Sequence, residues 1–87
     1  MKNLETLIKD LKNEAQSEWA IAEEMTDMYE QDAKDAQNAL DLLSKNWIEA
    51  AATHIAYLDT CIRERIVMAI YADKGAEFTA TLGWEVN

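Results

Sequence analysis

The side chains that could do chemistry in this chain are mostly carboxylates, and they are concentrated in one segment. Residues 14–35 hold eight acids and a single base, Lys34, and so carry −7 of the net charge of −9. Several of these acids lie three or four residues apart, where like charges on a helix repel each other and lower its stability. Two interpretations are open: a solvated face, or an acidic ridge that contacts a partner. The ridge comprises Glu14, Glu18, Glu23, Glu24, Asp27, Glu30, Asp32 and Asp35.

The other reactive side chains do not form the spacings that catalysis or metal binding requires. His54 and Cys61 are the only residues of their types, and seven helical residues separate them by about 10 Å, too far for a thiolate–imidazole pair. Glu14 and Glu18 lie one turn apart but lack the histidines of a di-metal bundle. No nucleophile motif or phosphate-binding loop is present in the sequence. We therefore expect no enzymatic activity, no metal and no cofactor.

Glu18 is the one acid whose position in the pattern is unusual. It falls inside the apolar stripe of its predicted helix, so its carboxylate needs a partner, a proton or access to solvent. Arg63 and Arg65 are candidate partners.

These residues must be positioned by helices, because residues 1–73 contain neither glycine nor proline and their apolar residues recur at helical spacing. The pattern predicts a helix over 3–30, a reversal within the polar run 31–38, and further helices over 33–44 and 46–73. A continuous helix over 36–73 is the alternative, which would give a hairpin of two long helices. The predicted fold class is therefore all-α, a small helical bundle with residues 1–87 as a single domain.

The segment after residue 60 is apolar on almost every side, which predicts that it is covered on several sides. A chain of 87 residues has a small core, and association with a second copy would supply the missing cover. Residues 76–87 alternate between apolar and polar, which predicts an extended tail that pairs with a partner strand or packs irregularly on the bundle. The predicted oligomer interface is Ile62, Ile66, Ile70, Tyr71, Phe78, Leu82 and Trp84.

The net charge and the single cysteine limit the classes of partner and the cellular compartments that the sequence fits. The net charge of −9 opposes direct binding of nucleic acid or of an anionic membrane. No apolar run is long enough for a membrane span or a signal peptide, and the single Cys61, expected to be buried, suits a reducing compartment. We expect a cytoplasmic protein whose partner is another protein, and a protein with a basic groove is one candidate.

Two functions follow from these observations. The first is a non-enzymatic acidic interaction protein that binds and regulates or inhibits another protein, as a homo-oligomer. The second is a DNA mimic, because eight acids over residues 14–35 give about one per 4 Å of helix, close to the roughly 3.4 Å between phosphates of one DNA strand. In size and acidity the chain is similar to the small acidic inhibitors that phages and plasmids make against host nucleases, an analogy of composition without a shared motif.

Overall fold

The computed structural model describes residues 1–16 and 23–84, with side chains for all of these but residues 23–25. This part of the chain is helical and contains no strand, so the all-α prediction is confirmed. The helices are α1 (Lys2–Ala15), α2 (Glu23–Ser44), α3 (Ile48–Ala56), α4 (Thr60–Lys74) and α5 (Ala76–Thr81). The described residues form an elongated molecule of 39 × 24 × 20 Å.

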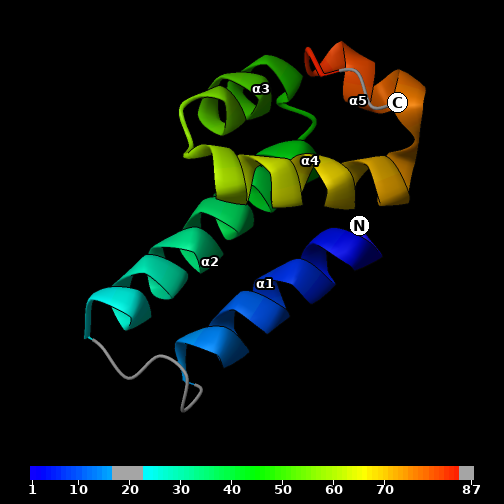
Figure 1. Cartoon of the computed structure of the whole chain (residues 1–87). Helices are drawn as coiled ribbons and strands as arrows, with labels where there is room; N and C mark the ends of the chain where they lie inside the picture. Colours follow the sequence, from blue (N-terminus) through cyan, green and yellow to red (C-terminus); the bar gives the residue numbers. More distant parts are fainter. Residues whose placement is uncertain (17–22, 85–87) are drawn as a thin grey trace.

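The first two helices form an antiparallel hairpin. Helix α4 lies across the end of this hairpin that holds the N-terminus (Figure 1). Of the remaining helices, α3 packs against α2 and α4, and α5 packs against α4 (Figure 1). The core fills the space where these helices meet. Its fully buried large apolar side chains are Leu4, Leu11, Ile55, Ile66 and Ile70.

The predicted helix over 3–30 is wrong in extent. Its first part is α1, whose buried leucines and isoleucine recur every three or four residues, but α1 ends at Ala15. The predicted reversal at 31–38 is also wrong, because this run lies in the middle of α2. The chain instead changes direction between α1 and α2, within a span that includes residues 17–22, outside the described residues.

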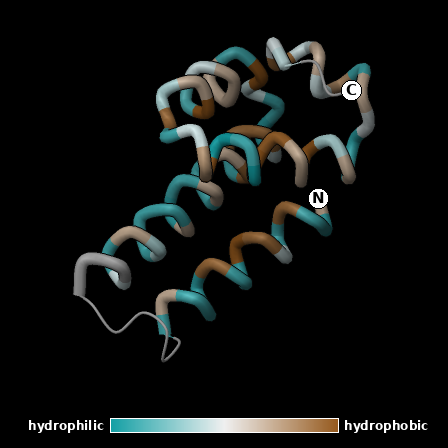
Figure 2. Tube along the Cα trace, viewed as in Figure 1, coloured by the Kyte–Doolittle hydropathy of each residue, from teal (hydrophilic) through white to brown (hydrophobic). Residues whose placement is uncertain are grey.

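Alanines explain why the polar run 31–38 continues as a helix. Ala33, Ala36 and Ala39 are buried and recur every three residues on the side of α2 that faces the core. Small side chains at these positions let the two hairpin helices approach closely, and alanine is the best helix former. Figure 2 shows that α2 is otherwise mostly hydrophilic. A search for large apolar residues therefore misses its buried face.

Helix α2 ends at Ser44, where the sequence predicts the end of a helix. Asn46 has a positive φ of 61°, and its N–H donates to the Leu43 carbonyl at 3.0 Å. The next N–H, of Trp47, donates to the Leu42 carbonyl at 2.9 Å. This pair of bonds is a Schellman motif, in which a left-handed residue after the helix satisfies its last carbonyls.

The predicted helix over 46–73 is in fact two helices. Hydrogen bonds from the Tyr57 and Leu58 N–H groups close the end of α3, and Asp59 then adopts an extended conformation before α4 begins at Thr60. The break lets α3 and α4 pack on one another, which one straight helix could not do. It is the reason that the apolar segment after residue 60 is covered by α1, α3 and α5 of the same chain.

The extended tail predicted for 76–87 is wrong for residues 76–81, which form α5, and residues 85–87 lie outside the described part of the chain. Thr79 and Leu82 are buried, and Phe78 is half-buried against the core. Phe78 and Leu82 are four residues apart, so the alternating pattern also fits one side of a helix. A helix satisfies its own backbone groups, whereas a single strand would leave them unpaired.

Candidate partner-binding surface

The structure divides the predicted acidic ridge between two sides of α2. Asp27 and Glu30 are exposed, whereas Asp32 and Asp35 are half-buried on the side that meets the turn between α3 and α4. Two further members, Glu23 and Glu24, occupy the first turn of α2. Glu18 lies outside the described residues.

The remaining member of the ridge, Glu14, forms an ion pair with Arg65 of α4. The guanidinium donates two hydrogen bonds, from Nη2 to Glu14 Oε1 at 3.2 Å and from Nη1 to Oε2 at 3.4 Å. Both side chains are about 40% exposed, so solvent weakens the pair. Arg63, the other candidate partner of Glu18, instead donates to the Leu58 carbonyl and the Thr60 hydroxyl.

Asp32 lies among these charged side chains, and its pKa is shifted by its burial and by their charges. Burial raises the pKa of Asp32 above its usual value of 3.8, and the negative charge of Asp35 raises it further. Arg65 lowers this pKa, while Asp59 and Glu14 raise it. Among these charges, the effect of Asp35 is larger than the opposing effect of Arg65, so the electrostatic contribution adds to that of burial. We call this group the Arg65 cluster: Glu14, Asp32, Asp35, Asp59 and Arg65.

A hydrogen bond from a side chain of α3 to the backbone of α2 helps to hold the cluster in place. His54 Nε2 lies 2.9 Å from the Asp35 carbonyl oxygen. A carbonyl only accepts, so Nε2 carries the hydrogen and donates it. This bond ties the end of α3, and hence the turn that bears Asp59, to the middle of α2. His54 is half-buried and acts as a packing residue between the two helices.

Two exposed large apolar side chains are close in sequence to members of the Arg65 cluster. Met28 is 50% exposed and lies one helical turn before Asp32 on α2. Tyr57 is 86% exposed and stands two residues before Asp59. Sequence reasoning did not assign a role to Asp59 or Tyr57, because it placed both inside a continuous helix. The Asp59–Thr60 pair, a common start of a helix, is the signal that could have located this turn.

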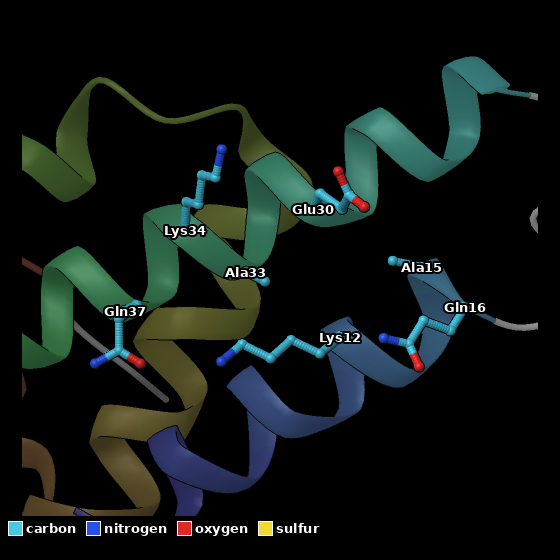
Figure 3. Close-up of a pocket in the computed structure, with 7 residues that line it drawn as sticks. All are labelled: Lys12, Ala15, Gln16, Glu30, Ala33, Lys34 and Gln37. Carbon is cyan, nitrogen blue, oxygen red and sulfur yellow. The ribbon is translucent and has the colours of Figure 1, made fainter.

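The opposite side of α2 borders a cavity of about 310 Å³ between α1 and α2. Figure 3 shows Lys12 reaching from α1 toward α2, whereas Lys34 extends away from α1. The lining is mixed in charge: Lys12, Ala15, Gln16, Glu30, Ala33, Lys34 and Gln37. Lys12 and Lys34 line this cavity together with Glu30, so its lining carries no net negative charge. The Arg65 cluster is therefore the more acidic side of α2.

The predicted oligomer interface is mostly internal to this chain. Ile62, Ile66, Ile70 and Leu82 are each less than 5% exposed and belong to the core. Phe78 and Trp84 are half-buried, and Tyr71 is 36% exposed. Cys61 is exposed, so the expectation that it is buried is wrong. It lies on the outer side of α4, because the break at residues 57–59 sets the orientation of that helix.

Within the described residues, no group of three or more histidine, cysteine, aspartate or glutamate side chains is placed to hold a metal ion. None of the described helices combines the length and apolarity that crossing a bilayer requires. Comparison with protein-family models, with curated proteins and with solved structures finds no match for this chain. Function is therefore inferred from the geometry of the chain itself.

Proposed function

We propose that this protein is a non-enzymatic interaction protein that binds a basic surface of a protein partner through the Arg65 cluster. The observation that supports the proposal is the gathering of charges from α1, α2, α4 and the turn before α4 around Asp32: Glu14, Asp35, Asp59 and Arg65 all lie close enough to shift its pKa, and Arg65 is paired with Glu14. Burial is the largest cause of the raised pKa of Asp32, and the negative charges of Asp35, Asp59 and Glu14 raise it further by repulsion. An arginine or lysine from a partner would relieve that repulsion.

The apolar neighbours of the cluster give the surface a second kind of contact. Met28 and Tyr57 can cover the aliphatic stem of a lysine or arginine while the carboxylates take its charged end. Methionine adapts its shape to different partners, and tyrosine is enriched at protein interfaces. Occupying a basic surface blocks whatever that surface otherwise binds, so regulation or inhibition of the partner is the expected consequence.

The test is binding of a fluorescent arginine-rich peptide, measured by anisotropy at low and high salt. The triple variant Asp32→Asn, Asp35→Asn, Asp59→Asn removes three charges of the cluster. The control Asp10→Asn, Glu49→Gln, Glu77→Gln removes three exposed charges elsewhere, so both variants have the same net charge. We expect the cluster variant to bind more weakly and with less salt dependence than the control. Equal binding by the two variants would refute the proposed site.

A DNA mimic is the second candidate function. Its support is the placement of acids on two sides of α2, with Asp27 and Glu30 on one side and Asp32 and Asp35 on the other. A basic groove that wraps around α2 would meet carboxylates on both walls. Lys34, which lies between these acids in the sequence, interrupts the negative charge.

Duplex DNA competition separates the two functions. If the protein is a mimic, it displaces duplex DNA from a DNA-binding partner, and the variant Asp27→Asn, Glu30→Gln weakens displacement as much as the cluster variant does. If only the Arg65 cluster is the site, the Asp27, Glu30 variant binds the peptide and displaces DNA as well as the wild type does, and only the cluster variant is impaired.

A further inference from the structure

The outer side of α4 is an exposed surface that the Arg65 cluster does not account for. Met68 is 52% exposed and Tyr71 is 36% exposed, although the inner side of the same helix is part of the core. Cys61 and Ala72 are also exposed. At 100° per residue these positions fall on one side of the helix, centred on Met68. We call this surface the Met68 face: Cys61, Glu64, Arg65, Met68, Tyr71 and Ala72.

Charge distinguishes this face from the rest of the molecule. Helix α2 carries seven acids and one base, whereas α4 carries two acids and three bases. The six residues of the Met68 face include one acid, Glu64, and one base, Arg65, so the face itself carries no net charge. The face therefore lacks the negative charge that a basic partner would seek. It is also a surface where two copies of a protein with a net charge of −9 can meet without opposing their acids.

We propose that two copies of this chain pair through their Met68 faces, with the two α4 helices antiparallel and Met68 on the two-fold axis. A two-fold interface brings each residue opposite the residue at the matching distance on the other side of the axis. Glu64 is four residues before Met68 and Tyr71 is three after it, so each Glu64 carboxylate meets the Tyr71 hydroxyl of the second copy. The hydroxyl donates and the carboxylate accepts.

The other edge of the face is complementary in shape. Arg65 is three residues before Met68 and Ala72 is four after it, so each guanidinium lies opposite a small side chain and keeps its ion pair with Glu14. The patch is one face of a 15-residue helix. Standard stable interfaces bury roughly 800 Å² per partner, more than such a face provides, so the association is weak and reversible. This proposal does not depend on the Arg65 cluster binding a basic partner.

Disulfide cross-linking tests the axis directly. The variant Met68→Cys, Cys61→Ser places one cysteine per chain at the axis, where two facing helices bring Cα atoms within the about 7 Å that a disulfide spans. The control Thr53→Cys, Cys61→Ser places an exposed cysteine on α3 instead. We expect mild oxidation to give a covalent dimer only for the Met68→Cys chain. Equal cross-linking of both variants, or of neither, would overturn the proposal.

The wild-type chain provides an internal check. Cys61 is seven residues from Met68, so two Cys61 residues would lie about 20 Å apart across the axis and would not cross-link. Rapid oxidation of the wild type to a dimer through Cys61 would contradict the antiparallel arrangement.

Sedimentation provides a second measurement that needs no new cysteine. We expect the wild type to shift from monomer toward dimer as its concentration rises into the hundred-micromolar range. Met68→Glu places two like charges at the axis and abolishes this shift, while Thr53→Glu adds the same charge elsewhere and preserves it. Circular dichroism confirms that both variants stay helical. A wild type that remains monomeric, or a Met68→Glu variant that still dimerises, would refute the proposal.

Discussion

At the scale of single residues, Asp73 provides the N-terminal cap that α1 lacks in its own sequence. Met1 makes no side-chain capping bond. Instead Asp73, in the last turn of α4, accepts hydrogen bonds from the N–H groups of Asn3 at 2.8 Å and Leu4 at 3.0 Å. The Asn3 side-chain amide donates to the same carboxylate at 2.9 Å. One carboxylate thus joins the start of the first helix to the end of the fourth.

These bonds determine how Asp73 titrates. Burial raises the pKa of Asp73, but the hydrogen bonds from Asn3 and Leu4 together outweigh it, and the pKa is held below its usual value of 3.8. A carboxylate whose pKa is lowered by folding stabilises the folded state at any pH above its unfolded pKa. This contribution is lost as the pH falls through the folded pKa.

We predict that Asp73→Ala lowers the free energy of unfolding by about 1 kcal/mol at neutral pH, the usual effect of losing a helix N-cap. The difference between wild type and variant should shrink as the pH falls below about 4, because the wild-type carboxyl then becomes protonated. Urea unfolding followed by circular dichroism across this pH range measures both quantities. The control is Asp10→Ala, which removes an exposed acid within α1, the helix that Asp73 caps. A difference that stays constant with pH would contradict the capping role.

At the scale of elements, Gly75 decides how α4 gives way to α5. Its φ of 88° and ψ of 177° lie in a region that is essentially restricted to glycine. Its N–H donates to the Tyr71 carbonyl at 2.8 Å, which closes α4. Its carbonyl accepts from the N–H and the hydroxyl of Thr79, at 3.2 and 2.8 Å, which opens α5. The turn folds α5 back so that Thr79 and Leu82 are buried.

We predict that Gly75→Ala destabilises the protein by about 1–3 kcal/mol, the usual strain of a side chain in this backbone region. An added Cβ would meet no atom within 4 Å, so the effect comes from the backbone and not from a clash. Thermal and urea unfolding measure it, with Lys74→Ala, the exposed neighbour, as control. A Gly75→Ala chain as stable as the control would show that the turn is not required for folding.

At the scale of the whole molecule, the two sides of α4 have different roles. The inner side carries Ile66, which is fully buried where α4 crosses the hairpin. The outer side carries Met68, only two residues away and half-exposed. A chain of this size buries a smaller fraction of its unfolded surface than a larger domain does, and it has little stability to spare. Losing the inner contacts should therefore unfold it, whereas changing the outer side should not.

We predict that Ile66→Ala lowers the free energy of unfolding by about 2–5 kcal/mol, as expected for a cavity in a core. Met68→Ala should change it by less than about 0.5 kcal/mol when measured at a dilution where the chain is monomeric. Urea unfolding of both variants at one low concentration checks the pair. Similar effects of the two substitutions would mean that α4 is oriented differently from the structure described.

The structural features that the sequence determined by itself depend on residues that are close together in the chain. The spacing of Leu4, Leu7 and Leu11 predicts α1 because a helix places residues three and four apart on one side, whatever covers that side. Gly75 marks the end of α4 because few other residues adopt its backbone conformation. The all-α class follows from such local rules. The acidic ridge is likewise visible in the sequence, but its division between two sides of α2 is not.

The tertiary structure alone decided which surfaces are covered and which charges meet. Periodicity indicates that α4 is apolar nearly all round, but only the packing of α1, α3 and α5 shows that Ile66 is inside and Met68 is outside. The Arg65 cluster joins residues from Glu14 to Arg65, 51 positions apart, through the reversal between α1 and α2 and the break before α4. The reversal between α1 and α2 buries the alanines of α2 in the core that these helices share. The free energy gained by this burial comes from packing between the two helices, so the local pattern of either helix alone does not predict it.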